Sequence, residues 1–444
     1  MVLEKIRCGR VDVNGDGVVV AGAKTYYVEG LLPGETADVE VAGGANGTVL
    51  KRYESSPLRV KPRCPQYDLC GGCTLQHVAY EEQLAVKTAY VKECLDAAGL
   101  SPEALIPCIG MKEPWHYRGK LQMAISEKGK RILAGFYEEN TRKVVNADDC
   151  DIQDKTGNRI VHTCKQLFVK HHIEPYREDR GTGLVRHVLV RVAAGTGQVL
   201  VVFVTVEEAF PGRNNLVVDL RAAHPEITSI VQNVNPRTTP IVLGERERIV
   251  YGKGYIEEEL MGKRFRIGAR TFFQVNPRQT ETLYKKAIEF AKPKATDVVV
   301  DAYSGVGTIA IAMAGLVSRV YGVEINAASV KAAKQNAWQN GVKNAEFHEG
   351  DAVAFVRAIA ASGTTPDIVV VDPPRQGLDP AFVTALNEVK PPKIVYISCD
   401  PSTLARDLKA FVENGYLLKR IQPVDMFCQT AHVESITLLS LKQL

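Results

Sequence analysis

The chain of 444 residues lacks long apolar segments, internal repeats and low-complexity tracts. No run of about 18 uninterrupted apolar residues is present, so the sequence predicts no membrane span. The first stretch, MVLEKIRCGRVDVNGDG, lacks the apolar core of a signal peptide. We therefore expect a cytoplasmic protein without a membrane partner.

The chain also has little excess charge. A net charge of +4 and a pI near 8.4 permit a nucleic-acid partner but do not demonstrate one. The length exceeds one ordinary core, so two or three domains are expected. In a cytosolic chain the ten cysteines should be mostly reduced, and clustered ones indicate metal binding or catalysis.

Three regions of the sequence differ in the secondary structure that their apolar residues and turn residues predict. Residues 1–60 carry Gly-containing turns between short alternating runs, which predicts a small antiparallel β-barrel or sandwich. Residues 61–265 begin with a cysteine cluster, continue with a helix over 81–99 that could pack on the last domain, and are then mixed and strand-rich. Residues 266–444 alternate strands with helices, which is typical of an α/β, doubly wound (Rossmann-like) domain.

A glycine-rich turn follows the first strand of this last region. In VVVDAYSGVGTIAIAMA, Gly305 and Gly307 allow the backbone to approach a ligand closely at the carboxyl edge of the sheet. Glu324 ends the next strand, where a carboxylate can accept hydrogen bonds from ribose hydroxyls. The same spacing, with Ala310, also fits a dinucleotide fingerprint, so an NAD-type oxidoreductase stays open at this point.

The next strand favours an adenosyl cofactor. In IVVVDPPRQGL, Asp372 ends the strand, and two prolines and Arg375 follow it. Prolines cannot donate to a ladder, so a stiff loop should project from the same edge. With the glycine turn and Glu324, this loop suggests a site for an adenosyl cofactor and a planar base. The chain here resembles the class I S-adenosylmethionine-dependent methyltransferases.

Cys399 ends a further apolar strand in KIVYISCDPS and should lie on the same edge. Ser402 is a possible N-cap of the helix that follows, and a helix N-terminus would lower the pKa of the thiol. The alternative is a packed core cysteine. A thiolate could add to C6 of a uracil and activate C5, and a base such as Glu434 would then remove the C5 proton.

Five stretches in order make the resemblance specific: RTFFQVNP, DAYSGVGT, DPPRQGL, YISCDPSTLARDL and DMFCQTAHVESI. Together they resemble the RNA uracil-C5 (5-methyluridine) methyltransferase family along essentially the whole chain. The resemblance implies that Cys399 is the nucleophile and Glu434 the base. It also implies that S-adenosylmethionine contacts Gln274, Tyr303, Glu324 and Asp372 beside the Gly305 turn. Two residues depart from the family pattern. Cys428 stands where the family usually has Pro, and Ser304 stands where many relatives have Cys.

The cysteine cluster is RCPQYDLCGGC, in which Cys64, Cys70 and Cys73 surround a Gly-Gly turn. Three such thiols indicate zinc or an iron–sulfur cluster, and the spacing does not separate the two. Possible fourth ligands are Cys94, Cys108 and Cys164. The family resemblance instead selects Cys150 and implies a [4Fe–4S] cluster, with a structural or RNA-shaping role.

Basic residues without an acid occur in KRFRIGARTFFQVNPRQ, which includes Arg264, Arg266, Arg270 and Phe272. Arginines can neutralise phosphates, and an aromatic ring can stack on a base. The alternative is a solvent-exposed strand whose phenylalanines pack in the core, which would have the same sequence pattern. Residues 177–191 form a second basic stretch. The N-terminal module resembles a TRAM domain, an OB-like RNA-binding fold.

We therefore predict S-adenosylmethionine-dependent methylation of uridine C5 in 23S rRNA, because the cysteine cluster resembles the rRNA-directed branch. RNA is the predicted partner, and no obligate protein partner is inferred. A tRNA uracil-C5 methyltransferase is the nearest alternative. An iron–sulfur oxidoreductase would leave DPPR and SCDPS unexplained. A non-catalytic iron–sulfur RNA-binding protein would leave the nucleophile and base without a purpose.

Overall fold

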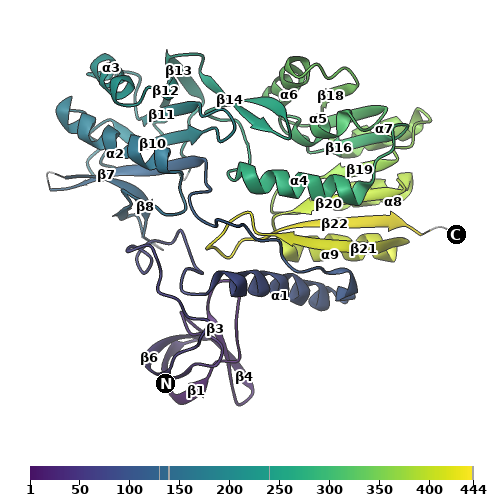
Figure 1. The fold of residues 1–444 in the computed structure, drawn as a ribbon, viewed down its shortest axis with the longest axis horizontal. Coiled ribbons are helices and arrows are strands. Elements are labelled where there is room, and N and C mark those ends of the chain that lie inside the picture. Colours follow the sequence, from purple (N-terminus) through teal and green to yellow (C-terminus); the bar gives the residue numbers. More distant parts are fainter. Residues whose placement is uncertain (130, 139–140, 240, 443–444) are drawn as a thin grey trace.

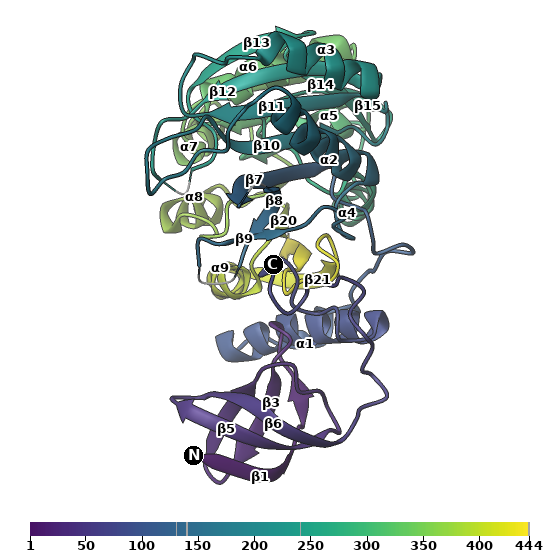
Figure 2. The same ribbon diagram turned by 90° about the vertical axis from the view of Figure 1, so that its left-hand side faces the viewer.

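The protein was analysed as a computed structural model that describes residues 1–129, 131–138, 141–239 and 241–442. In these residues the strands form four sheets, and Figure 1 shows how they are arranged. The N-terminal sheet lies at one end, the central sheet and the last sheet lie next to each other, and helix α1 runs between the N-terminal sheet and the last one (Figures 1 and 2). The last two residues of the predicted third domain, 443 and 444, fall outside the described residues.

The N-terminal sheet has six strands in the order β1-β5-β6-β4-β3-β2. They are β1 (Val2–Arg7), β2 (Arg10–Val11), β3 (Gly17–Ala21), β4 (Lys24–Val28), β5 (Thr36–Gly43) and β6 (Asn46–Glu54). The prediction of an all-antiparallel module is wrong at one pair, because β4 and β6 run parallel. Closure of this sheet into a TRAM-type barrel stays a prediction.

Helix α1 (Tyr80–Ala98) begins and ends close to the predicted positions. Gly99 caps it in the left-handed conformation at φ 75°, which explains why the helix stops there. Val86 packs toward the N-terminal sheet with Val11 and Leu32, whereas Val91 and Leu95 join the core of the last sheet. Because α1 has buried residues toward both neighbours, it joins the two modules.

The central sheet has seven strands in the order β13-β12-β11-β10-β7-β8-β9. Strands β10 and β11 are antiparallel neighbours, and the turn between them contains Gly195 and Gly197. Helices α2 and α3 pack beside each other, and both contribute to the core under this sheet. The elements are β7 (Lys120–Lys128), β8 (Arg131–Tyr137), β9 (Val144–Asn146), α2 (Lys155–Lys170), β10 (Val185–Val192), β11 (Val199–Thr205), α3 (Arg213–Ala223), β12 (Ile227–Val234) and β13 (Arg246–Tyr251).

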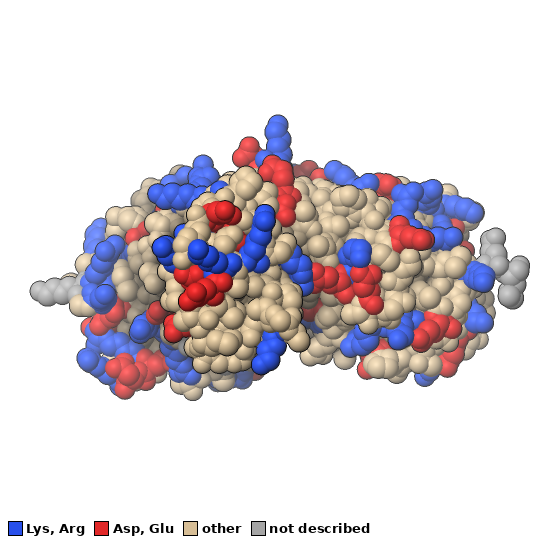
Figure 3. All heavy atoms as spheres, turned by 90° about the horizontal axis from the view of Figure 1, so that it is seen from below, with Lys and Arg blue, Asp and Glu red and all other residues tan. Residues whose placement is uncertain are grey.

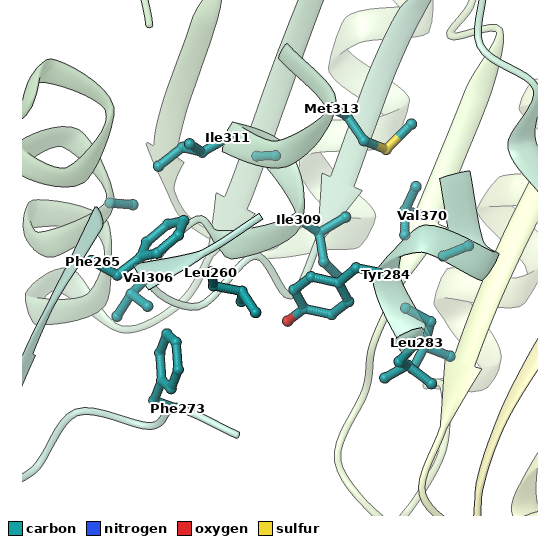
Figure 4. Packing of buried hydrophobic residues seen from close by; sticks show 14 of the residues in the cluster. Leu260, Phe265, Phe273, Leu283, Tyr284, Val306, Ile309, Ile311, Met313 and Val370 are labelled. Carbon is teal, nitrogen blue, oxygen red and sulfur yellow. The ribbon is translucent and has the colours of Figure 1, made fainter. Parts of the chain in front are cut away.

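A hairpin of β14 (Tyr255–Leu260) and β15 (Lys263–Gly268) connects the central and last sheets. Its inward residues Leu260 and Phe265 share one hydrophobic core with Tyr284, Val306 and other residues of the last region (Figure 4). The predicted boundary between residues 265 and 266 falls within β15. The hairpin therefore belongs to the same packed unit as the nucleotide-type sheet.

The last sheet has seven strands in the order β18-β17-β16-β19-β20-β22-β21, with helices on both faces. The first five run parallel and β22 is antiparallel to β20, which confirms an α/β fold of the class I methyltransferase type. The elements are α4 (Pro277–Ala291), β16 (Val298–Ala302), α5 (Thr308–Ala314), β17 (Arg319–Glu324), α6 (Ala327–Gln339), β18 (Ala345–Glu349), α7 (Ala352–Ala361), β19 (Ile368–Val371), α8 (Pro380–Val389), β20 (Lys393–Ser398), α9 (Pro401–Glu413), β21 (Tyr416–Val424) and β22 (Glu434–Leu441).

The segment after α1 continues this sheet beyond its edge strand. A short 3-10 helix, Pro102–Ala104, is followed by bridges from Leu105 to Ile421 and from Ile109 to Val424 of β21. Residues 80–111 therefore pack on the last sheet although they precede it by more than 100 positions. In the described part of the chain, no helix is long and apolar enough to cross a membrane.

Candidate active site

The carboxyl ends of four parallel strands form one edge of the last sheet. Ala302 of β16 pairs with Val323 of β17 and with Val371 of β19, and Val371 pairs with Tyr396 of β20. The residues that follow these strands therefore come together at this edge, as predicted for parallel strands. They include the glycine turn, Glu324, Asp372 and Cys399.

The glycine turn is held by Glu324. The Gly305 N–H donates to Glu324 Oε2 (3.1 Å), and the Asn326 N–H donates to Oε1 (2.8 Å). Tyr303, Gly305 and Gly307 have φ values of 68°, 53° and 83°, so the turn needs the left-handed region three times. Glycine adopts that region without strain, and a Cβ at Gly307 would lie 2.8 Å from the Phe347 ring.

Two carboxyl groups lie near the carboxyl ends of β16 and β19: Asp301 is buried, and Asp372 is partly buried. Burial raises the pKa of Asp301 to about 8, although the Ala310 N–H donates to it at 2.9 Å. Burial also raises the pKa of Asp372 to about 7. Among the described residues, Asp301 Oδ1 has no hydrogen-bond partner. In the described residues, the carboxyl groups at this edge therefore have more oxygen atoms than hydrogen-bond donors that reach them.

Cys399 is half-buried directly after β20, at the predicted edge. The predicted N-cap is wrong, because Asp400, not Ser402, caps α9 by accepting from the Ser402 and Thr403 N–H groups. The predicted lowering of the thiol pKa is also wrong. Burial, followed by the nearby Glu434 and Asp372 carboxylates, raises the pKa of Cys399 to about 11, while Arg375 lowers it.

Glu434 is the first residue of β22 and comes to the site through antiparallel pairing. Ser398 pairs with Ser435, so Cys399 and Glu434 are the next residues along the two neighbouring strands. Glu434 is only 3% exposed, and its Oε2 has no partner in the described part of the chain. Burial and the neighbouring Asp372 raise its pKa to about 8, and Arg375 opposes that shift.

Sequence reasoning did not single out Asp407 of α9, which anchors the loop after Asp372. Its Oδ2 accepts from the Leu378 N–H (2.8 Å) and the Tyr396 hydroxyl (2.7 Å). The loop passes so close that a Cβ at Gly377 would lie 2.6 Å from Asp407 Oδ2. Its place within the stretch YISCDPSTLARDL, eight positions after Cys399, was the available signal.

His432 was missed as well. Arg375 Nη2 lies 3.4 Å from both ring nitrogens of His432, in the segment just before Glu434. Burial lowers the pKa of His432, and the Arg375 charge lowers it further. The charge of Arg375 also lowers the pKa of Cys399 and of Glu434.

Four of the predicted metal ligands, Cys64, Cys70, Cys73 and Cys150, line one cavity of about 420 Å³. Burial raises the pKa of all four thiols, to about 12 for Cys73 and about 11 for Cys150. Cys94, Cys108 and Cys164 do not line this cavity. Within the described ranges no three Cys, His, Asp or Glu side chains gather closely enough to hold a metal ion, so a metal centre is not shown.

The other predicted residues lie between the central and last sheets. Gln274 lines a small cavity of about 20 Å³ with Lys120 and Arg191. Phe272 is 75% exposed, whereas Phe273 is buried in the core. Arg264 and Arg270 are exposed. Arg266 is engaged, since its guanidinium lies 4.9 Å from the centre of the Tyr255 ring.

Charge on the surface does not identify an RNA path by itself. Seen from the side of the N-terminal sheet, basic and acidic side chains are interspersed (Figure 3). This agrees with the small net charge of +4. Recognition of RNA would have to rest on local groups.

Comparison with known proteins finds the same fold in proteins described as RNA methyltransferases. A family model described as tRNA (Uracil-5-)-methyltransferase matches residues 230–442. An uncharacterized RNA methyltransferase of Bacillus cereus is 40% identical over 436 residues, which are 97% of this chain and 95% of that protein. A similar protein of Halalkalibacterium halodurans is also 40% identical, over 97% of this chain and 96% of its own length.

One solved structure is similar over nearly the whole length. It is the Pyrococcus abyssi tRNA (uracil-54, C5)-methyltransferase in complex with S-adenosyl-L-homocysteine, with 30% identity and a TM-score of 0.79. The match covers 98% of this chain and 100% of that one. With its conserved architecture and the edge that carries the glycine turn and Cys399, the chain belongs to the S-adenosylmethionine-dependent RNA uracil-C5 methyltransferase family.

Proposed function

We propose that this enzyme transfers the methyl group of S-adenosylmethionine to C5 of a uridine in 23S rRNA. The observation that carries the proposal is the pairing of β20 with β22, which leaves Cys399 and Glu434 as neighbours at the cofactor edge. A thiol and a buried carboxyl, one oxygen of which has no partner in the described part of the chain, are the two groups that this reaction needs.

Cys399 is the proposed nucleophile. Its sulfur, as thiolate, forms a bond to C6 of the uracil, and the electrons of the C5=C6 double bond move to C5 and O4. C5 then takes the sulfonium methyl group, and S-adenosylhomocysteine leaves. Arg375 favours the thiolate, because its charge opposes the rise in the pKa of Cys399.

Glu434 is the proposed base. It removes the proton from C5, the electrons of that C–H bond restore the C5=C6 double bond, and the bond from C6 to the Cys399 sulfur breaks. The base must be ionised for this step, and the pKa of Glu434 is raised to about 8. The uracil would have to leave any RNA stack to reach the two groups.

The cofactor is proposed to lie along the glycine turn. Glu324 would hold the ribose hydroxyls, and Tyr303, Gly305, Asp372 and Gln274 would contact the remaining groups. Glu324 supports this role, because it already binds two backbone N–H groups and still has lone pairs at the strand end.

A [4Fe–4S] cluster held by Cys64, Cys70, Cys73 and Cys150 is part of the proposal. Its support is that the four thiols line one cavity beside Ile152 and Phe136. A donor set of four thiols spread around a cavity suits a polynuclear cluster better than a single ion. When bound, the cluster would cross-link segments that are distant in sequence.

RNA is proposed to reach the site past Phe272, Arg264, Arg266 and Arg270, with the N-terminal module acting as a TRAM domain. The exposed Phe272 ring supports this path, since it can stack on a base. The division into residues 1–60, 61–265 and 266–444 and a cytoplasmic location also stay predictions.

A tRNA is the second candidate substrate. It is favoured by the similarity to the Pyrococcus abyssi enzyme, which is a tRNA methyltransferase. The rRNA proposal rests instead on the cysteine pattern and its resemblance to the rRNA-directed branch.

The test is methyl transfer from tritiated S-adenosylmethionine to 23S rRNA and to tRNA transcripts, with digestion of the product to nucleosides. We expect labelled 5-methyluridine from 23S rRNA. Label in tRNA only would show that tRNA, and not 23S rRNA, is the substrate. Label in neither RNA would refute the proposed function. Iron and sulfide assays after anaerobic purification test the cluster, which a colourless zinc protein would contradict.

A further inference from the structure

The loop that joins β21 to β22, residues 425–433, ends directly before Glu434. Four successive carbonyl groups of this loop accept hydrogen bonds from residues outside it. Met426 O accepts from Asn276 Nδ2 (3.0 Å), Phe427 O from Lys87 Nζ (3.1 Å), Cys428 O from the Tyr117 hydroxyl (3.0 Å), and Gln429 O from the Thr74 and Leu75 N–H groups (both 3.1 Å).

Helix α1 supplies three of the side chains that hold this loop, Tyr80, Gln83 and Lys87, and the Tyr80 hydroxyl donates to Asp425 Oδ2 (2.8 Å). Lys87 Nζ lies 2.6 Å from Asp425 Oδ1, and both side chains are fully buried. Gln83 forms a reciprocal pair with Gln429, because its Nε2 donates to Gln429 Oε1 (3.0 Å) and its Oε1 accepts from the Gln429 N–H (3.2 Å). Gln83 is 1% exposed, so water does not compete for these bonds.

Gln429 is the residue of the loop that most needs support. Its φ of 69° lies in the left-handed region, which a side chain with a Cβ rarely adopts. Its N–H, carbonyl and side-chain amide all bind partners from residues 74–83. These contacts stabilise a backbone turn that the loop would not keep on its own.

The segment that holds Gln429 begins next to the cysteine cluster. Thr74 directly follows Cys73, and Gln83 Nε2 also donates to the Leu75 carbonyl (2.9 Å). The Cys73 segment, α1 and the loop before Glu434 are thus joined by consecutive hydrogen bonds. By contrast, Glu434 Oε2 itself has no partner among the described residues.

We propose that Gln83 is a positioning residue for Glu434, acting through Gln429, and that this contact serves the elimination step. The inference rests on the proposed function, in which Glu434 is the base. In the described residues Glu434 Oε2 has no hydrogen-bond partner, so the place of the carboxyl is set by the backbone that enters β22. A loop that leaves its turn moves the carboxylate away from the C5 proton, while Cys399 stays on β20.

The predicted consequence is that the covalent Cys399–uracil intermediate forms at its normal rate but breaks down more slowly. Addition of Cys399 and methyl transfer would continue in a Gln83→Met variant, but removal of the C5 proton would slow. The protein–RNA adduct would therefore accumulate. Methionine has nearly the volume of glutamine, so the packing is kept while the hydrogen bonds are lost.

The experiment measures the steady-state fraction of enzyme that migrates with labelled RNA on a denaturing gel. It compares the wild type, Gln83→Met, Gln429→Ala, the double variant and Glu434→Gln, with the RNA that accepts methyl groups in the assay above. Leu95→Ala is the matched control, because Leu95 is a buried α1 residue twelve positions after Gln83 that packs in the core of the last sheet.

We expect about three- to tenfold more adduct in Gln83→Met and in Gln429→Ala than in the wild type. The double variant should add little to either single change, since both remove one contact. Leu95→Ala should lower the melting temperature but keep the adduct at the wild-type fraction. This split separates positioning from a general loss of stability.

Two outcomes would overturn the inference, and they differ. If Glu434→Gln traps adduct while Gln83→Met and Gln429→Ala match the wild type or the control, Gln83 does not position the base and the proposed function stands. If Glu434→Gln traps no adduct, Glu434 is not the base, and both the proposed mechanism and the positioning role fail.

Discussion

The two halves of the candidate site are held in different ways. The cofactor half is local, because Gly305 is bound by Glu324, 19 positions away, and Asp301 by Ala310, 9 positions away. The base half is held over long distances in the sequence. Tyr117 and Cys428 are 311 positions apart, Lys87 and Asp425 are 338 apart, and Gln83 and Gln429 are 346 apart.

This difference teaches how the site is assembled. A strand–turn–helix unit can form its ligand turn from its own residues, so the turn appears as a short motif. The loop before Glu434 has no such unit. It reaches its turn only after α1 and the Cys73 segment have packed on the last sheet, and its stability should therefore depend on the whole molecule.

The largest effect on methyl transfer is expected at Cys399, which lies between the two halves of the site. Cys399→Ala should lower methyl transfer by about a thousandfold or more, because it removes the atom that adds to C6. Binding of S-adenosylmethionine, measured by calorimetry, should stay close to the wild type. Cys94→Ala removes a half-buried thiol of α1 and is the matched control. A Cys399→Ala enzyme with near-normal turnover would contradict the nucleophile.

Lys87→Met should destabilise the loop before Glu434, which is held by residues distant in the sequence. It leaves the Asp425 carboxylate buried without its cation, which should lower the free energy of unfolding by about 3–5 kcal/mol in denaturant titrations. The exposed pair of Lys92 and Asp96 on the same helix provides the control, and Lys92→Met should change little. Equal effects of the two changes would show that the loop does not depend on the buried pair.

The pH dependence of stability should reveal the buried base. The pKa of Glu434 is raised from an ordinary 4.5 to about 8, so the folded state binds a proton more tightly than the unfolded state. Its contribution to stability is full below about pH 4.5 and is lost as the pH rises through about 8.

Glu434→Gln should remove this pH dependence. Relative to the wild type, the variant should gain on the order of 3 kcal/mol in the free energy of unfolding between pH 5 and pH 8. Parallel stability curves for the two proteins in urea titrations would contradict the raised pKa.

The smallest effect is expected in the local half. Glu324→Gln turns an amide N–H₂ toward a backbone N–H donor, which should lower the free energy of unfolding by about 1 kcal/mol. The Kd for S-adenosylmethionine should rise by about tenfold, measured by calorimetry. A loss of stability as large as that of Lys87→Met would remove the contrast between the two halves.

Much of the cofactor half could be predicted from the sequence. The alternation of strands and helices, the glycine turn and the strand-end positions of Glu324, Asp372 and Cys399 follow from local patterns. The electrostatics could not be predicted. A helix N-terminus suggested a lowered thiol pKa, but burial and two neighbouring carboxylates raise it, and these neighbours come from other strands.

The sequence by itself determined the parallel sheet and the ligand edge, because apolar periodicity and turn residues act within a few tens of residues. It also carried the motifs by which the family is recognised. Only the tertiary structure decided how Glu434 is supported. Apart from Asn276, the partners named for its loop lie in residues 74–117, and their hydrogen bonds exist only when α1 has packed beside β21 and α9.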